Sequence, residues 1–187
     1  TVCENDAVVL QGSAGVVANT PAGAHHSYMW TNNTGEPIAN PNQKEVTVNP
    51  TQTTTYYLTV TDNETGCERT VQQIINVNPL PKVSFAPAET VICEFDEFHL
   101  SIVGDLTDCT ITWEKLKGGV SKPDDAAKWA GLTDIYDNPE TSDYIYRAHI
   151  TNNYTGCERV LNHQLKATRA LQPAITIDDS KADIMCQ

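Results

Sequence analysis

The feature that most constrains this chain is an internal repeat marked by cysteines. Residues 1–6 (Thr-Val-Cys-Glu-Asn-Asp) are similar to residues 91–96 (Val-Ile-Cys-Glu-Phe-Asp), and residues 65–69 (Thr-Gly-Cys-Glu-Arg) recur unchanged at 155–159. In both copies the cysteines of the two motifs are 64 residues apart. Two motifs in the same order and at the same spacing indicate that one structural unit occurs twice.

The repeat predicts how the chain is divided. We expect a first repeat at residues 1–80, a second repeat at residues 81–172, and the beginning of a third at residues 173–187. The third is predicted from Cys186, which lies about one repeat length beyond Cys93. The native protein is therefore expected to be longer and to contain an array of such repeats.

Alternating apolar and polar residues predict β-strands in both repeats. In the first repeat, Tyr56, Leu58 and Val60 alternate with polar residues, which is typical of a strand with one buried face. Two prolines make residues 78–82 a short, stiff linker. The predicted strands cover residues 7–11, 27–31, 45–48, 54–61 and 70–77 in the first repeat, and 97–103, 110–115, 133–137, 143–151 and 160–168 in the second. Long segments with helical spacing are absent, so the predicted fold class is all-β.

This number of short strands favours an immunoglobulin-like sandwich of two antiparallel sheets in each repeat. Trp30 and Trp113 would lie on the third strand and face the core. Tyr56 and Tyr146 fall where such domains place a tyrosine corner. Both repeats carry an apolar residue where antibody domains have their inter-sheet cysteine, so any disulfide must be of another kind.

Charge and hydropathy exclude several classes of partner. The net charge is −12, and residues 1–81 contain only Lys44 and Arg69 as basic side chains, so nucleic acid and anionic membrane are not expected as partners. No stretch approaches the roughly 18 apolar residues of a membrane helix, and residues 1–25 lack a signal-peptide pattern. Because the chain begins at Thr1, we expect that an export signal or an upstream domain has been removed.

The first repeat resembles a known family, the immunoglobulin-like or PKD-like repeats of large secreted and surface proteins of Bacteroidetes. The match is carried by the start Cys-Glu-Asn-Asp at 3–6, the central Trp30, the Asn-Pro-Thr strand at 49–61 and the closing Gly-Cys at 66–67.

The second repeat keeps the same pattern with a divergent middle. It retains Cys93, Trp113, the Asn-Pro pair at 138–139 and the Gly-Cys pair at 156–157. The resemblance implies a scaffold used for adhesion, surface display or spacing, and it specifies no ligand.

The equal spacing predicts two disulfides, Cys3 with Cys67 and Cys93 with Cys157. Closing a loop of this length is worth about 4 kcal/mol in the chain-entropy model. The alternatives are reduced, buried cysteines or a zinc site; the equal spacing argues against the first, and the missing Cys-x-x-Cys and His pairs against the second.

Two cysteines have no partner in this scheme. Cys109 has no counterpart in the first repeat and is expected to be a buried free thiol. Cys186 is expected to pair with a cysteine beyond the end of this chain, and a Cys109–Cys186 bond is the alternative.

No motif for catalysis or for a cofactor is found, so neither an enzyme nor a cofactor is predicted. The adjacent His25 and His26 are expected in a solvated loop, although a metal pair is the alternative. The acidic pairs at 124–125 and 178–179 leave calcium binding open, but their spacing matches no calcium loop, and no metal site is assigned.

An insertion at residues 117–131 of the second repeat is the candidate for ligand binding. Trp129 within it, together with Tyr136, could form an aromatic platform for a sugar. The alternative is that Trp129 folds back to cover the sandwich, since large exposed aromatic residues are uncommon without a partner.

The sequence thus predicts a non-catalytic spacer or adhesion segment of a larger multi-repeat protein. The alternative is a carbohydrate-binding accessory region of a secreted hydrolase. Expected partners are other repeats of the same chain, with surface proteins or glycans as further candidates. The segment is expected to be a monomer outside the cell or on its outer surface, reached through an oxidising compartment.

Overall fold

A computed structural model describes residues 1–14, 26–171 and 173. His25, Cys186 and the acidic pair at 178–179 lie outside the described residues. The chain forms two compact units. The first comprises Thr1–Val83, Gly104–Thr110 and His149–Val160; the second comprises Ser84–Val103, Ile111–Ala148 and the chain from Leu161 onward. The repeat boundaries predicted at residues 80 and 172 remain predictions.

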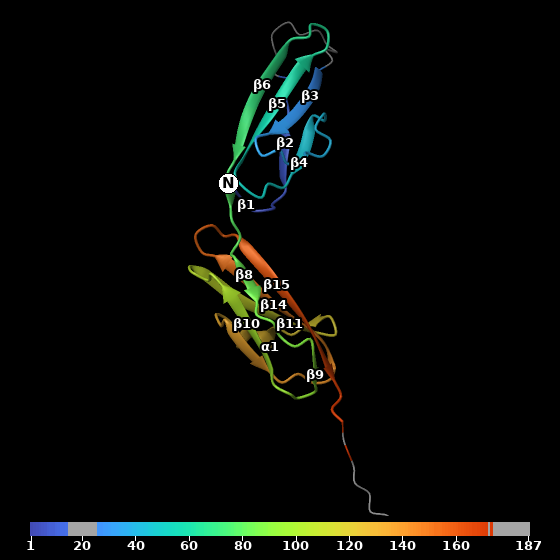
Figure 1. The fold of residues 1–187 in the computed structure, drawn as a ribbon, viewed down its shortest axis with the longest axis vertical. Helices are drawn as coiled ribbons and strands as arrows, with labels where there is room; N and C mark the ends of the chain where they lie inside the picture. Colours follow the sequence, from blue (N-terminus) through green and yellow to red (C-terminus); the bar gives the residue numbers. More distant parts are fainter. Residues whose placement is uncertain (15–25, 172, 174–187) are drawn as a thin grey trace, which may run out of the picture. The chain divides into compact units, whose positions relative to one another are not determined.

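The strands of the first repeat have the immunoglobulin order (Figure 1). They are β1 (Val2–Cys3), β2 (Val8–Gln11), β3 (His26–Asn32), β4 (Glu45–Val48), β5 (Thr54–Asp62), β6 (Glu68–Ile75) and β7 (Val77–Asn78). One antiparallel sheet pairs β2 with β4, and the other has the order β3-β5-β6. The short strand β1 runs parallel to β7, which continues the direction of β6. Two strands facing three, with the first strand on the last, is the arrangement of an immunoglobulin-like sandwich.

The core of the first repeat comes from the inward positions of these strands. Tyr56 and Leu58 are buried on β5, while Tyr57 between them is half-exposed, as the alternation predicted. Trp30 is buried, and its indole N–H donates to the carbonyl oxygen of Gln43 at 3.0 Å. The buried cluster consists of Leu10, Trp30, Val46, Val48, Tyr56 and Leu58.

The second repeat has the same order with additions. Its elements are β8 (Val83–Phe85), β9 (Val91–Cys93), β10 (Phe98–Gly104), β11 (Cys109–Lys117), β12 (Val120–Ser121), α1 (Pro123–Ala127), β13 (Asp134–Asp137), β14 (Ser142–Asn152) and β15 (Glu158–Thr168). One sheet has the order β13-β10-β8 and the other β12-β11-β14-β15-β9. As in the first repeat, a short strand, β9, runs parallel to the last one, β15.

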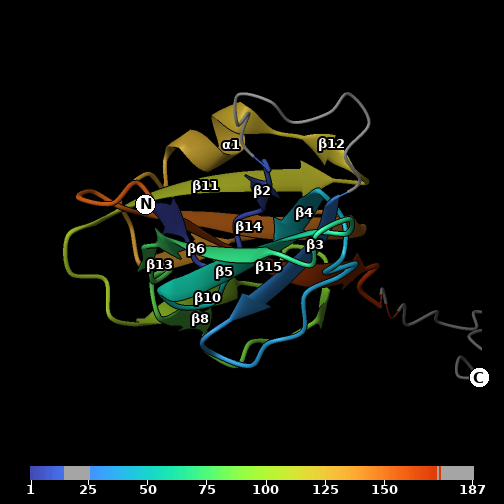
Figure 2. The same ribbon diagram turned by 90° about the horizontal axis from the view of Figure 1, so that it is seen from above.

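The insertion at 117–131 contains β12 and α1 and lies along β11, as Figure 2 shows. Trp113 on β11 is buried, and its indole N–H donates to the carbonyl oxygen of Leu132 at 3.0 Å. The core side chains that are almost fully buried include Phe98, Leu100, Ile135, Tyr146, Ile150 and Leu165.

The predicted all-β class is confirmed, and all ten predicted strands are present within two residues at each end. The elements that the sequence did not predict separately are β1, β7, β8, β9, β12 and α1, with two to five residues each. Segments this short carry too few residues for a period to be visible.

Candidate functional site

The first cysteine of each repeat lies in a tightly hydrogen-bonded start motif, which we define as residues 3–6 and 93–96. In the first, the backbone N–H of Asp6 donates to the carbonyl of Cys3 at 3.0 Å, and the N–H of Cys3 donates to the Asp6 carboxylate at 2.8 Å. Asn5 has a positive φ of 67°, and its N–H donates to the carbonyl of Pro50 at 3.0 Å. These bonds fix the direction that the backbone takes after Cys3, the last residue of β1.

The second start motif repeats the backbone hydrogen bonds and the positive φ of the first. The N–H of Asp96 donates to the carbonyl of Cys93 at 3.3 Å, and Phe95, with φ of 65°, donates its N–H to Pro139 at 2.9 Å. The amide side chain of Asn138 donates to the carbonyl of Phe95 at 3.2 Å, as Asn49 does to Asn5 at 3.1 Å. The two start motifs therefore share these three hydrogen bonds, whereas the bond from the N–H of the cysteine to the aspartate carboxylate is observed for Cys3.

The second cysteine of each repeat follows a turn motif, which we define as residues 62–67 and 152–157. In the first turn, the Asp62 carboxylate accepts the backbone N–H groups of Glu64 and Thr65, and these bonds hold the pKa of Asp62 below its ordinary value. Gly66 has a φ of 72°, a value that side chains with a Cβ rarely adopt. The N–H of Cys67 donates to the Thr65 hydroxyl at 3.3 Å.

In the second turn, Asn152 takes the place of Asp62. Its side-chain oxygen accepts the N–H groups of Tyr154 and Thr155 at 3.0 and 2.9 Å. Gly156 again has a φ of 72°, and the N–H of Cys157 donates to the Thr155 hydroxyl at 3.2 Å. The two turns therefore present their cysteines in the same way.

One disulfide joins the two kinds of motif: Cys3 is bonded to Cys157, with a Cα–Cα distance of 5.6 Å and 154 residues between them in sequence. Both cysteines lie in the first compact unit. Cys67 and Cys93 are exposed free thiols. The predicted pairs Cys3–Cys67 and Cys93–Cys157 are therefore wrong in this structure.

Strand length explains the correction in the first repeat. Cys67 precedes β6, whereas Cys3 pairs with Asn78 at the end of β7, which continues from β6. At about 3.3 Å per residue, this extended run separates the two cysteines by roughly 35 Å. A disulfide requires Cα atoms within about 7 Å, so the two cannot meet.

The same argument applies to the second repeat. Cys157 precedes the 11-residue strand β15, and Cys93 pairs with Thr168 at the far end of that strand. The separation is again roughly 35 Å by strand rise. Equal spacing in the sequence was compatible with pairing inside a repeat and with pairing between repeats, and only the strand register distinguishes the two.

Cys109, the remaining cysteine within the described residues, is a half-buried free thiol. Burial raises its pKa, and the nearby Asp105 and Asp108 carboxylates add to that effect. A raised pKa lowers the thiolate fraction, so Cys109 is a weaker nucleophile for disulfide exchange than an ordinary cysteine.

The predicted aromatic platform is not formed. Trp129 is only 3% exposed and packs against Trp113 and Tyr146, at ring-centroid distances of 6.4 and 5.9 Å. Its backbone N–H donates to the carbonyl of Ala126 at 3.0 Å, where α1 turns the insertion back onto the sandwich. Trp129 therefore serves the core, as the alternative interpretation expected. Tyr136 remains 54% exposed.

Tyr136 instead belongs to a small polar cluster on the outer face of β10 and β13. Its ring lies flat on His99 at 4.4 Å, and Ser101 donates to the Asp134 carboxylate at 2.6 Å. This hydrogen bond is the largest cause of the lowered pKa of Asp134.

The cluster contains the three residue types of a serine-hydrolase triad, but not the geometry. Ser101 and Asp134 both approach the same ring nitrogen, Nε2 of His99, at 2.9 and 3.4 Å. In a triad the histidine uses one nitrogen for the serine and the other for the aspartate. Asp134 is therefore not placed to orient His99 through its second ring nitrogen, as the aspartate of a triad does.

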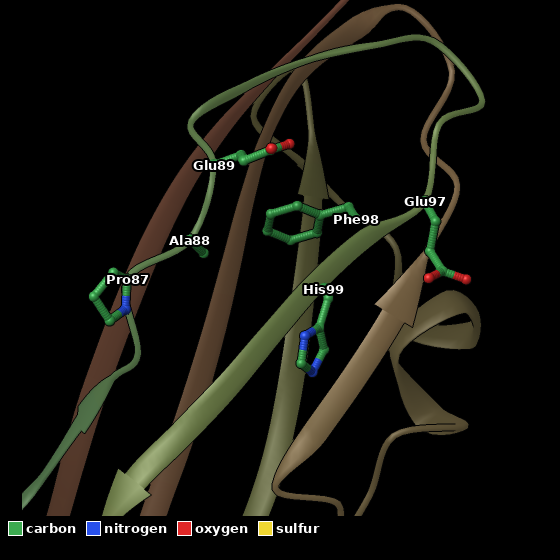
Figure 3. A pocket seen from close by; sticks show the side chains of 6 residues that line it. All are labelled: Pro87, Ala88, Glu89, Glu97, Phe98 and His99. Carbon is green, nitrogen blue, oxygen red and sulfur yellow. The ribbon is translucent and has the colours of Figure 1, made fainter.

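An open hollow of about 470 Å³ lies beside this cluster (Figure 3). Figure 3 shows Glu89 and Glu97 on either side of the Phe98 ring, with His99 below it. Phe98 is 1% exposed, so the floor of the hollow is core, and its rim carries two carboxylates. Among the described residues, no group of three or more His, Cys, Asp or Glu side chains is placed to hold a metal ion.

Sequence reasoning missed a buried ion pair. The Nζ of Lys115 lies 2.7 Å from the Asp137 carboxylate, and both side chains are 9% exposed. The Tyr146 hydroxyl donates to the same carboxylate at 2.7 Å, and the Lys115 ammonium lies 5.2 Å from the centre of the Tyr144 ring. Because the acceptor is a side chain, Tyr146 departs from the usual tyrosine corner, which bonds to backbone. The missed signal was two charged residues at inward positions of predicted strands.

Comparisons with known proteins leave the family open. No protein-family model matches the chain, and no curated protein is significantly similar to it. Within the described residues, no helix has the length and hydropathy needed to cross a membrane.

Three solved structures illustrate the range of structural matches. Murine CEACAM1b shares 15% identity over 90% of this chain and 95% of that chain, with a TM-score of 0.35. The three N-terminal domains of the bacteriophage RB49 outer capsid protein Hoc share 15% identity over 88% of this chain and 55% of that one, with a TM-score of 0.34. The fibronectin(III)-like modules of Clostridium thermocellum CbhA share 10% identity over 94% and 93%, with a TM-score of 0.30. These scores are low, so the immunoglobulin-like assignment depends on the strand order of each repeat.

Proposed function

We propose that this chain is a non-catalytic structural and interaction segment of an exported protein that contains further repeats of the same kind. The observation that carries the proposal is the Cys3–Cys157 disulfide between the start motif of the first repeat and the turn motif of the second. In this proposal such a bond joins consecutive repeats covalently. That is the property required of a spacer or of an adhesion segment that presents a surface.

The disulfide also supports a location outside the cell. Structural disulfides persist in oxidising compartments and are rare in the cytosol, where thiols are kept reduced. The acidic composition adds no basic surface for nucleic acid. The carbohydrate-binding alternative loses its main support, because Trp129 is buried.

Serine variants test this proposal. Cys3→Ser should lower the free energy of unfolding by about 2–4 kcal/mol, the usual value of a native disulfide. Cys67→Ser and Cys93→Ser are the matched controls, and each should change it by less than about 0.5 kcal/mol because both thiols are exposed and free. Urea unfolding of the three variants measures the difference. If Cys67→Ser were as costly as Cys3→Ser, the bond would lie within the first repeat and the proposal would fail.

A second measurement addresses location. Protein directed to an oxidising compartment should carry the bond, whereas protein made in a reducing cytosol should show free Cys3 and be less stable by the same amount as Cys3→Ser. Equal stability of the two preparations would argue against an exported role.

A further inference from the structure

We propose that Cys67 and Cys93 are the attachment points for neighbouring repeats. Each would form the same start-to-turn disulfide that joins Cys3 to Cys157, with a further repeat of this kind as the partner. The inference deepens the proposed function and rests on it, because it extends one observed bond to the two ends of the segment.

The two turn cysteines share a local backbone geometry but differ in bonding and in burial. Cys67 and Cys157 follow turns with the same glycine φ of 72° and the same hydrogen bond from the cysteine N–H to a threonine hydroxyl. Cys157 is bonded and fully buried, whereas Cys67 is free and exposed. Cys67 thus has the geometry of a bonded cysteine without its partner.

The start cysteines show the same contrast. Cys3 is bonded and half-buried, and Cys93, in the same hydrogen-bonded start motif, is free and exposed. Two apolar side chains beside Cys93 are exposed: Val91 and Phe95 are 59% and 63% exposed. The first start motif has the polar Asn5 at the position of Phe95. A partner that covered this surface would remove apolar area from water, which favours binding.

The observed bond also fixes the direction of pairing. The start cysteine of the first repeat skips the turn of its own repeat and bonds to the turn of the next. By the same rule, Cys93 bonds to the turn cysteine of a following repeat, and Cys67 to the start cysteine of a preceding one. Cys93 and Cys67 then bond to different kinds of motif, a start cysteine always to a turn cysteine. Contacts of this head-to-tail type can extend into an open chain of repeats.

The bond-forming step needs an oxidant, and a small-molecule disulfide such as oxidised glutathione supplies it. The thiolate of Cys93 attacks one glutathione sulfur and releases one reduced glutathione. The thiolate of Cys67 from the partner then attacks the mixed disulfide and releases the second. Two protein thiols are oxidised to one disulfide, two protons are released, and one oxidised glutathione becomes two thiolates that take up those protons.

Two complementary variants of the whole chain test the pairing. Both carry Cys109→Ser and Cys186→Ser, so that neither of the chain's two remaining cysteines outside the observed disulfide and the proposed pair can contribute. One also carries Cys67→Ser and keeps Cys93, and the other carries Cys93→Ser and keeps Cys67. Each is oxidised with glutathione, alone and as an equimolar mixture, at about 1 mM, the effective concentration that a short flexible linker gives. Non-reducing gels measure the dimer, and peptide mass mapping identifies the linked cysteines.

The proposal predicts dimer in the mixture at a level at least about tenfold above either variant alone, which corresponds to a preference of 1.4 kcal/mol. The dimer should contain the peptide pair 67–93. Equal amounts of dimer in all three solutions, or no dimer in the mixture, would overturn it. In each case the same map reports Cys3–Cys157, so a failure of the attachment points with that bond intact is distinguished from a failure of the proposed function.

Discussion

The two repeats share one strand order but fill their cores with different chemistry. Two residues beyond the core tryptophan, the first repeat has Asn32 and the second has Lys115. One residue before the Asn-Pro pair, the first has Val48 and the second has Asp137. In the second repeat these two positions form a buried ion pair at 2.7 Å, whereas in the first Val48 is part of an apolar core. The strand frame therefore does not dictate what lies between the sheets.

The insertion accounts for much of this difference. In the first repeat, Asn32 closes a short loop: its side chain accepts the N–H of Gly35 at 2.8 Å and donates to the carbonyl of Glu36 at 2.8 Å. In the second, the longer segment brings Trp129 over the same end of the core, and Lys115 lies 5.9 Å from its ring centre. A buried cation beside aromatic rings and a carboxylate is the arrangement that the insertion makes possible.

Giving the second repeat the residue of the first should have the largest effect. Asp137→Val removes the carboxylate next to buried Lys115, and breaking a buried pair in this way costs about 3–5 kcal/mol. Urea unfolding followed by tryptophan fluorescence measures the loss. Adding Lys115→Met to Asp137→Val removes the charge as well and should recover most of the stability. A single variant as stable as the parent would show that the ion pair is not what distinguishes the two cores.

Removing the indole hydrogen bond should affect the two repeats alike. Trp30→Phe and Trp113→Phe each delete an N–H that donates to a loop carbonyl at 3.0 Å, which leaves the carbonyl without that donor. Each should cost about 1–3 kcal/mol in the free energy of unfolding. Thermal unfolding of both variants checks the expectation. A cost in one repeat only would mean that the shared strand order does not carry a shared role for this tryptophan.

The smallest expected effect is a difference between the two turn motifs in how their local stability depends on pH. The folded-state pKa of Asp62 lies below its ordinary value of 3.8, so its contribution to stability is present above that pH and is lost as the pH falls through the lowered pKa. Asn152 in the other turn does not titrate. Amide exchange at Glu64 and Thr65 should therefore become faster on acidification relative to Tyr154 and Thr155. The variant Asp62→Asn should remove that difference, and an unchanged difference in the variant would contradict the assignment.

The sequence predicts most of the long strands. Each of them has one buried face, so apolar and polar residues alternate along it. Tyr56 and Leu58 are an example, and Trp30 and Trp113 lie in the core as expected. The disulfide partner of a cysteine cannot be predicted from such alternation. The partner of Cys3 depends on the register of β1 with β7, and a two-residue strand leaves no visible period.

The insertion shows the same limit. Trp129 had two possible environments, and only the turn made by α1 determines which one it occupies. The Lys115–Asp137 pair combines residues from two strands that are not adjacent in sequence. Taken alone, each charged residue is an exception to the pattern of apolar residues at inward strand positions. Together they form an ion pair that compensates both charges.

The measurement that tests this account most directly is mass mapping of non-reduced peptides after the free thiols have been blocked at acidic pH. The account predicts one linked pair containing Cys3 and Cys157, with Cys67 and Cys93 recovered as blocked thiols. Recovery of Cys3 linked to Cys67 and of Cys93 linked to Cys157 would contradict it.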